Sequence, residues 1–522
     1  MPARRVSWVL GSAMAIGACA LLPAVASAHP EECAATTFAS AALVSPFEGV
    51  NEASEGCMST AAINGIDDSA AQLAPGESAG TSNLRLLAHE DKRPPFESTA
   101  DFNSDIAFED GYAFQGNYDG VQVWDVRDGA RPRLAGFVHC PGSQNDVTVN
   151  EGILVTSTDS RRNKAECEGN RTATNAESGS EATSWEGLRV FDVSNPANPR
   201  YITAVRTDCG AHTHTVLPQR NRLLIYVSSY DSAAGRVNCE GDHDKISIVE
   251  VPLGNPAAAR VLSEPKLFTA AAGYRGPEGG NPGDADTRAT NGCHDITVYQ
   301  ALNLAAGACM GEGLMLDISD PERPRVLSNI VDNENFAFWH SATISDNGRK
   351  VLFTDELGGG SAPTCNETVG PKKGADAIYE ITDRANPKFL SYFKIPRTQD
   401  NTENCVAHNG NLIPNNKGRD VLVQSWYQGG ISIIDWTDGR NPKELAWFDR
   451  GPFVPQNLAG FWSSYFYNGY IYGSEIQRGW DVFEFDSSAV AGSRAYKSGT
   501  LNPQTQFPQG KPGWGNAAGK KS

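Results

Sequence analysis

Seven times between residues 104 and 486 the sequence repeats one pattern of apolar segments. Two apolar segments are joined by a Gly, Asn or Asp turn, and a third ends in an acidic residue, usually before an Asn-Pro or Arg-Pro turn. The third segment is clearest in GVQVWDVRDGARPR, GLRVFDVSNPANPR, KISIVEVPLGNPAA, GLMLDISDPERPR, AIYEITDRANPK, GISIIDWTDGRNPK and WDVFEFDSS. Repeats of roughly 40 to 65 residues with about four short strands are typical of β-propeller blades. Since one such sheet cannot bury both faces alone, the repeats must pack against one another.

The last repeat predicts how the ring closes. It supplies strands at 461–468, 469–474 and 480–486 but no fourth strand. The segment SNLRLLAHED, which starts at Ser82, is the candidate for the missing outer strand. A strand donated from the N-terminal side would leave no open sheet edge. The sequence therefore predicts an all-β fold, a seven-bladed β-propeller closed by an N-terminal strand.

We expect four segments along the chain: a signal peptide at 1–28, an irregular N-terminal lead at 29–82, the propeller at 83–487 and a tail at 488–522. The lead is rich in Ala, Ser, Glu and Gly. The tail is rich in Gly, Pro, Gln and Lys, a composition that favours disorder.

The first segment has the features of a secretory signal. Arg4 and Arg5 precede an apolar stretch that ends in Ala26-Ser27-Ala28, a small-residue cleavage site. Lipidation at Cys19 is an alternative, against which the apolar residues after Cys19 argue. We therefore expect an exported protein, secreted or associated with the cell envelope.

The third segment of the repeats also resembles a known family. VQVWD, LRVFD, LMLDIS and ISIID are similar to the strand motif of the LVIVD-repeat proteins, a family of bacterial exported β-propellers. The resemblance covers residues 83–487. It implies the fold and the compartment, but no particular activity, because propellers serve as enzymes, binding proteins and scaffolds.

Ten of the 11 cysteines follow Cys19, and an even number in an exported chain predicts five disulfides. In a propeller, the loops between blades share a face with the loops that join the second and third strands. This geometry pairs cysteines of neighbouring blades, and two further pairs complete the set. The predicted bonds are Cys140–Cys167, Cys209–Cys239, Cys365–Cys405, Cys293–Cys309 and Cys33–Cys57.

The charge of the chain limits its partners. With 62 acidic against 44 basic residues the formal net charge is −18, which argues against nucleic acid and anionic membrane surfaces. Beyond the start, no stretch approaches the ~20 apolar residues of a membrane span. The expected partner is a small molecule or an extracellular protein.

At least four of the nine histidines take the same place in consecutive repeats. The innermost strand begins with His294, His340 and His408 in the fourth, fifth and sixth repeats. The third repeat offers His212 or His214, which share a strand face because side chains alternate. Innermost strands line the central channel, so these imidazoles should converge there. Neutral imidazoles bind metals of the Fe, Cu and Zn class. The sequence predicts a metal site of His214, His294, His340 and His408, with His212 as the alternative to His214.

A structural role explains the same pattern. Duplication copies residues, and each His would then fill the channel and bond to a neighbouring strand, as Ser, Asn or Asp does in the other repeats. In this interpretation the protein is a scaffold that binds a ligand or partner on its loop-rich face. In the other it is an oxidoreductase that uses Fe or Cu, with Zn less favoured. No GxSxG, phosphate-loop or HExxH motif indicates a different chemistry.

Acidic and aromatic residues accompany the histidines. Metal-bound His usually donates its second N–H to a carboxylate or carbonyl, and the candidate carboxylates are Glu334, Glu403 and Asp295. The junctions between second and third strands combine aromatic with polar residues, as ligand sites do. Their candidate ligand-contacting residues are Tyr118, Tyr230, Trp426 and Tyr427. We attribute the acidic residues of these junctions, including Asp355 and Glu356, to turn formation.

Overall fold

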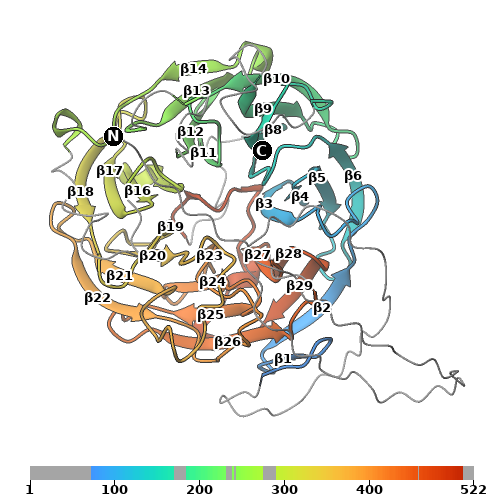
Figure 1. The fold of residues 1–522 in the computed structure, drawn as a ribbon, viewed down its shortest axis with the longest axis vertical. Helices are drawn as coiled ribbons and strands as arrows, with labels where there is room; N and C mark the ends of the chain where they lie inside the picture. Colours follow the sequence, from blue (N-terminus) through green and yellow to red (C-terminus); the bar gives the residue numbers. More distant parts are fainter. Residues whose placement is uncertain are drawn as a thin grey trace, which may run out of the picture. The chain divides into compact units, whose positions relative to one another are not determined.

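The computed structural model describes residues 72–169, 184–230, 238–239, 243–273, 290–455 and 458–509. All lie in the compact unit from Cys57 to Ser522. The predicted signal peptide, the Cys33–Cys57 bond and most of the N-terminal lead fall outside these residues. Seven antiparallel sheets follow one another around a central axis (Figure 1). The predicted seven-bladed propeller is confirmed.

The first four blades each contain four consecutive strands, from the innermost to the outermost. Blade one contains β3 (Asn103–Glu109), β4 (Tyr112–Asn117), β5 (Gly120–Asp125) and β6 (Arg133–His139). Blade two contains β7 (Val147–Asn150), β8 (Ile153–Arg162), β9 (Trp185–Asp192) and β10 (Arg200–Arg206). Blade three contains β11 (Thr213–Pro218), β12 (Arg222–Ser228), β13 (Ser247–Pro252) and β14 (Arg260–Ser263). Blade four contains β15 (Asp295–Tyr299), β16 (Leu304–Cys309), β17 (Glu312–Asp317) and β18 (Arg325–Ile330).

The remaining blades continue the order, and the last takes its outer strand from the N-terminal side. Blade five contains β19 (Trp339–Ile344), β20 (Lys350–Asp355), β21 (Asp376–Glu380) and β22 (Lys388–Phe393). Blade six contains β23 (Gly410–Leu412), β24 (Val421–Ser425), β25 (Ile431–Asp435) and β26 (Lys443–Arg450). Blade seven contains β27 (Phe461–Tyr467), β28 (Tyr470–Glu475), β29 (Gly479–Phe485) and β2 (Leu84–Glu90).

The apolar core lies between neighbouring blades. One buried cluster joins Leu224 and Ile248 of blade three to Ile296 and Leu314 of blade four, and the other interfaces are built in the same way. Both faces of the inner strands are therefore covered, which explains their nearly continuous apolar sequence. The outer strands are half exposed, so they alternate and carry more polar residues.

The ring closes as the sequence predicts. Strand β2 pairs antiparallel with β29, with Leu84 opposite Phe485 and Glu90 opposite Trp480. A further strand, β1 (Ser78–Gly80), pairs with β26 as a fifth strand of blade six. The ordered part of the ring therefore begins within the predicted lead, before residue 83.

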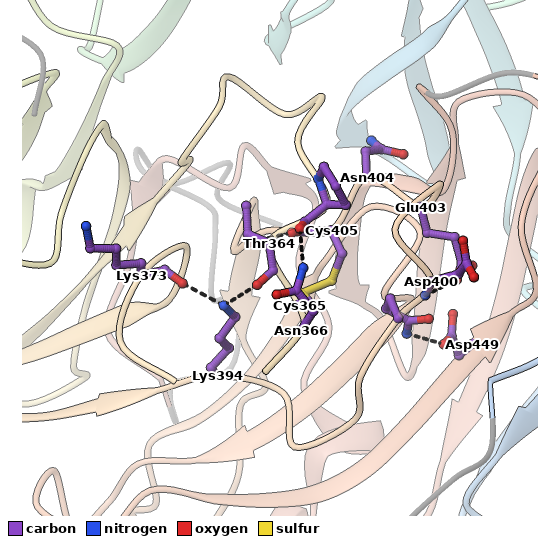
Figure 2. Close-up of a disulfide and its surroundings, with 12 residues drawn as sticks. Thr364, Cys365, Asn366, Lys373, Lys394, Asp400, Glu403, Asn404, Cys405 and Asp449 are labelled. Atoms are coloured by element: carbon purple, nitrogen blue, oxygen red, sulfur yellow. Dashed lines mark hydrogen bonds between the residues drawn. A yellow bond between two sulfur atoms is a disulfide. The ribbon is translucent and has the colours of Figure 1, made fainter. Parts of the chain in front are cut away.

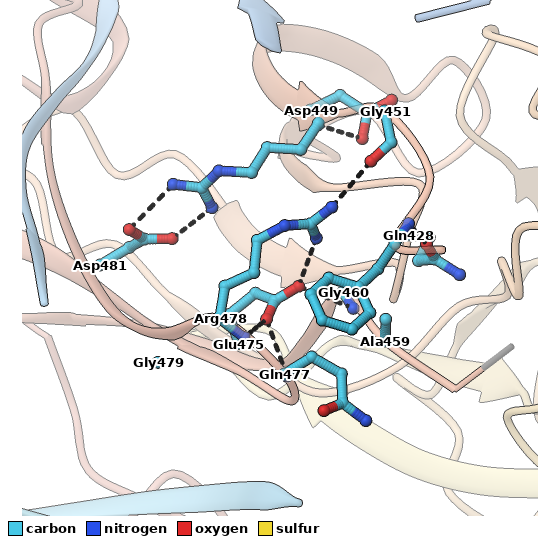
Figure 3. Close-up of polar contacts among 12 residues, drawn as sticks. Gln428, Asp449, Gly451, Ala459, Gly460, Glu475, Gln477, Arg478, Gly479 and Asp481 are labelled. Carbon is cyan, nitrogen blue, oxygen red and sulfur yellow. Dashed lines mark hydrogen bonds and ion pairs between the residues drawn. The ribbon is translucent and has the colours of Figure 1, made fainter. Parts of the chain in front are cut away.

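A buried ion pair crosses the seam between the last two blades. Arg450 of β26 makes two contacts to the carboxylate of Asp481 in β29, at 2.5 and 3.0 Å (Figure 3). The same carboxylate accepts a hydrogen bond from Nδ1 of His89 in β2, at 2.7 Å. One acidic side chain therefore connects blade six, blade seven and the closing strand.

The predicted disordered tail is wrong for residues 488–509. Strand β30 (Thr500–Leu501) pairs with β3, and β31 (Thr505–Gln506) runs parallel to β15. Asn502 bonds to Val149 of blade two. The red end of the chain crosses the middle of the ring in Figure 1. Composition suggested disorder because polar residues rarely form a core, but here their amides satisfy the open edges of the innermost strands.

Four of the five predicted disulfides are present, namely Cys140–Cys167, Cys209–Cys239, Cys293–Cys309 and Cys365–Cys405. Such a number is typical of proteins from oxidising compartments. In the part of the chain that the structure describes, no helix has the length and apolar character needed to span a membrane.

Candidate metal centre at the channel mouth

Four buried imidazoles from four consecutive blades lie in a row at one end of the central channel. His212, His294 and His408 immediately precede or adjoin the innermost strands β11, β15 and β23, and His340 lies in β19. Neighbouring ring centroids are 4.4 Å apart for His212 and His294, 4.1 Å for His294 and His340, and 4.3 Å for His340 and His408. The repeat position identified in the sequence therefore brings these side chains together.

His214 is not part of this row. Its Nε2 lies 2.8 Å from the Thr148 hydroxyl and its Nδ1 lies 2.8 Å from the Ser157 hydroxyl, both in blade two. His212, which we named as the alternative, takes the place. Residue spacing could not separate the two because they share a strand face; the hydroxyl partners on the neighbouring blade decide which one faces the channel mouth.

A carboxylate faces two of the imidazoles. Glu356 Oε1 lies 3.6 Å from Nε2 of His408, and its Oε2 lies 4.0 Å from Nε2 of His340. His340, Glu356 and His408 form a group whose donor atoms all lie within 4.8 Å of one another, and His294, Asp295 and His340 form a second. Among the described residues no such group contains three histidines. The donors therefore form two overlapping sets of two His and one carboxylate, which share His340.

The contacts around the first set fix the orientation of its donors. Nδ1 of His408 donates to the backbone carbonyl of Trp462 at 2.5 Å, and a carbonyl can only accept. The lone pair of His408 is therefore on Nε2, the atom that faces Glu356. The Tyr427 hydroxyl donates to Glu356 Oε1 at 2.6 Å. Such outer contacts are typical of metal ligands, whose orientation and basicity they set.

At the other end of the row, His212 and His294 interact directly. Nδ1 of His212 lies 2.7 Å from Asp159 Oδ2, to which it donates. The two Nε2 atoms are 2.8 Å apart, so one of them must carry the proton between them. With both rings neutral, His294 donates to His212.

Burial keeps the central imidazoles neutral. Burial, together with the neighbouring His294 and His408, holds the pKa of His340 well below its usual range. Burial also lowers the pKa of His408 to about 3, although the Trp462 carbonyl opposes the shift. Burial and then Glu356 raise the pKa of Tyr427, so its hydroxyl remains a donor. The two His of the first set therefore offer lone pairs at any neutral pH.

The carboxylates that we predicted are only partly right. Glu334 is exposed in a turn in which its backbone N–H bonds to Asp332. Glu403 is buried, but it accepts from the backbone N–H of Asp400 at 2.9 Å, and burial raises its pKa to about 8 (Figure 2). Neither joins a donor group with the histidines in the described ranges, whereas Asp295 does. Proximity in sequence to a His did not predict proximity in space.

Sequence reasoning missed Glu356 as a donor. It follows β20 in the Thr354-Asp355-Glu356 junction, whose acidic residues we attributed to turn formation. Its backbone N–H bonds to the carbonyl of Phe338, just before His340. The available signal was its place on the same face as the histidines, one strand after His340.

Three of the four predicted aromatic residues adjoin the site. The ring of Tyr427 lies 4.5 Å from that of His408, and the ring of Tyr230 lies 4.9 Å from that of His212. Tyr118 belongs to the apolar cluster that contains Tyr427 and Trp462. Trp426 is wrong: it is buried against Phe393 in a different core cluster. In this extended turn, consecutive side chains point to opposite sides, so only Tyr427 reaches the mouth.

Disulfides anchor the loops that carry the histidines. Cys209, Cys293 and Cys405 lie within three residues of His212, His294 and His408, respectively. Figure 2 shows the Cys365–Cys405 bond, where Lys394 donates to the carbonyls of Thr364 and Lys373, each at 2.6 Å. The mouth is therefore held by covalent bonds as well as by hydrogen bonds.

Comparisons with known proteins add the fold and nothing finer. No family model matches the chain, and no curated protein is similar to it. Three solved structures are similar at low identity. The 6-phosphogluconolactonase candidate from Bacteroides uniformis is 11% identical, with a TM-score of 0.43 and coverage of 72% of this chain and 89% of that chain. Kuenenia stuttgartiensis hydrazine synthase is 12% identical, with a TM-score of 0.45 and coverage of 74% and 94%. The Dos1 propeller is 11% identical, with a TM-score of 0.40 and coverage of 74% and 78%.

Proposed function

We propose that this protein is an exported propeller of the LVIVD-repeat type that binds one transition metal ion at its channel mouth and acts there on a small molecule. The ligands in this proposal are His340, His408 and Glu356. The observation that carries it is the pair of Nε2 atoms that face one carboxylate, at 3.6 and 4.0 Å.

A cation explains this arrangement better than the imidazoles and carboxylate do alone. The lone pair of His408 points at Glu356, and burial keeps the ring neutral, so no ring proton lies between the two. Facing electron pairs repel unless a cation lies between them. Since the four donor-bearing atoms come from different blades, the ring of blades itself would fix the geometry of the ion.

Two His and one carboxylate favour iron in its ferrous state. This donor set leaves coordination positions open and is typical of non-haem iron oxygenases. We therefore infer oxidoreductase chemistry with Fe, and Cu as the second choice because imidazole also suits it. His294 and His212 extend the row toward Asp159 and orient one another.

Aromatic rings flank the row at both ends. Trp462 and Tyr427 lie 5.3 and 4.5 Å from His408, and Phe338 lies 5.4 Å from His294. Side chains of this kind bind apolar or aromatic parts of small molecules. We infer a substrate with such a part rather than a sugar phosphate or a polyanion, which the acidic chain would repel.

Elemental analysis of protein purified without a histidine tag tests the proposal. We expect one Fe or Cu per chain in the wild type and less than a tenth of that in His340→Ala, His408→Ala and Glu356→Gln. His139→Ala and Glu334→Gln are matched controls, because both residues are exposed and outside the row; both should keep the metal.

Two results would contradict the proposal. A metal-free wild type that takes up neither Fe(II) nor Cu(II) would favour the scaffold interpretation, in which the histidines only fill the channel. Equal metal content in Glu356→Gln and wild type, with loss in Asp295→Asn, would move the centre to His294, Asp295 and His340.

A further inference from the structure

A ring of oxygen-bearing side chains lies next to the histidine row. In every blade, the residue after the repeat position of the histidines carries a side-chain oxygen. All seven of these residues are buried: Asp105, Asp146, Thr213, Asp295, Ser341, Asn409 and Ser464. Three of them are acidic, although the channel is one of the least hydrated parts of the fold.

The three carboxylates act on one another across the channel. Burial and repulsion from Asp146 raise the pKa of Asp105 to about 7. Burial and repulsion from Asp146, Asp105 and Glu356 raise the pKa of Asp295 well above its usual range. The charged groups that act on Asp295 are therefore acidic, and buried charges of one sign are costly unless a cation balances them.

Hydrogen bonds satisfy only part of this ring. Asp105 Oδ1 accepts from the hydroxyls of Ser463 and Tyr465, both at 2.5 Å. Asp146 Oδ2 accepts from the backbone N–H of His214 at 2.8 Å, and Nδ1 of that residue lies 3.1 Å away.

Both oxygens of Asp295, by contrast, and Oδ1 of Asn409 have no hydrogen-bond partner among the described residues. The Thr213 hydroxyl beside Asp295 donates instead to the carbonyl of His294, at 2.6 Å.

The C-terminal segment brings a further oxygen to the same place. Nε2 of Gln504 lies 3.3 Å from Asp105 Oδ2, so its amide group is at the carboxylates. Oε1 of Gln504 is buried and has no partner among the described residues. The segment is held there by its neighbours, since Thr505 donates to Val216 and Gln506 donates to Ile344, at 2.6 and 2.9 Å.

We propose that the channel binds a calcium ion between Asp105, Asp146, Asp295 and Gln504, and that this ion fixes the C-terminal segment as the floor of the channel. The donors are all oxygen, which selects a hard cation rather than Fe or Cu. They come from three blades and the C-terminal segment, and they are spread more widely than the compact donor groups at the mouth. Calcium accepts six to eight oxygens, including water, in irregular geometry, whereas magnesium demands a small octahedron.

The experiment is calcium analysis of the full chain, purified in calcium-containing buffer and then freed of unbound ion. We expect one Ca²⁺ per chain in the wild type and at least a tenfold lower content in Asp105→Asn and in Asp295→Asn. Gln504→Ala should also lose the ion. Gln506→Ala, in the same segment but bonded to the backbone of blade five, should retain it.

The calcium site and the proposed metal centre can fail independently. His408→Ala should lose Fe or Cu and keep Ca²⁺, while Asp105→Asn should lose Ca²⁺ and keep Fe or Cu. A wild type without Ca²⁺, a wild type that holds Mg²⁺ instead, or Asp105→Asn and Asp295→Asn proteins with full Ca²⁺ content would overturn the proposal. If a variant fails to fold, its thermal midpoint in Ca²⁺ and in EGTA decides: folded wild type must lose stability in EGTA.

Discussion

Asp481 at the seam of the ring should be one of the most sensitive positions for stability. Its side chain is fully buried and holds Arg450 of blade six and His89 of the closing strand. Although burial alone would raise it, Arg450 and His89 lower the pKa of Asp481 to about 2. The change Asp481→Asn removes the charge, keeps the shape and leaves Arg450 buried without a counter-charge.

The structure sets the size of the effect. A pKa lowered from 3.8 to about 2 corresponds to roughly 2 kcal/mol of stability at neutral pH. Leaving a buried cation unpaired typically costs about 3–5 kcal/mol, so we expect a loss in that range. The control Glu484→Gln breaks contacts to Arg85 and Arg494, whose side chains are 61% and 56% exposed, and should cost about 1 kcal/mol or less.

Guanidinium unfolding with the disulfides intact measures both variants. The stability that Asp481 contributes is present above pH 3.8 and lost as the pH falls through its folded pKa, so the difference between wild type and Asp481→Asn should shrink toward pH 2. Asp481 also raises the pKa of His89 against the effect of burial, so that part of the stability is present below pH 6.5 and lost at higher pH. Equal costs for Asp481→Asn and Glu484→Gln would refute the argument that the seam depends on this ion pair.

Three further predictions concern the channel mouth. Tyr427→Phe removes the donor to Glu356 and should weaken metal binding 10- to 100-fold, measured by competition with a chelator; unchanged affinity would exclude Tyr427 from the site. Gly360→Ala should reduce metal content, because φ is +75° and a Cβ would lie 2.8 Å from Glu356 Oε1 and closer still to the Tyr427 hydroxyl; Gly370→Ala, with a similar φ and open space around it, is the control. Replacing Cys365 and Cys405 with Ser removes a bond that spans 40 residues, which should lower the free energy of unfolding by about 4 kcal/mol; a thermal midpoint equal to the wild type would contradict this.

Much of the fold could be predicted because it depends on local repetition. Each repeat encodes the same strands and turns, and one sheet can bury its faces only against its neighbours. The missing outer strand after Asp486 and the spare strand after Ser82 then fix the closure. The disulfides also followed, because blade geometry places the loops between blades next to the loops joining the second and third strands. Such inferences need the order of strands but not the packing of individual side chains.

The C-terminal segment shows where composition misleads. Its Gln, Asn and Thr residues cannot form an apolar core, which suggested disorder. Within the channel, however, the edges of the innermost strands present N–H and C=O groups that lack partners, and polar side chains satisfy them. Asn502 and Gln506 do this for blades two and five. No local sequence pattern encodes that demand, because it exists only once the ring has formed.

The site divides in the same way. The sequence alone determined that His294, His340 and His408 meet, since equal positions in a ring of repeats must converge on its axis. Only the tertiary structure decided between His212 and His214, because Thr148 and Ser157 of the neighbouring blade bind the latter. It also replaced Glu334 and Glu403 with Glu356 as the carboxylate that faces the imidazoles. The physical reason is that repetition fixes where a strand begins on the ring, whereas the direction of each side chain depends on partners from blades distant in sequence.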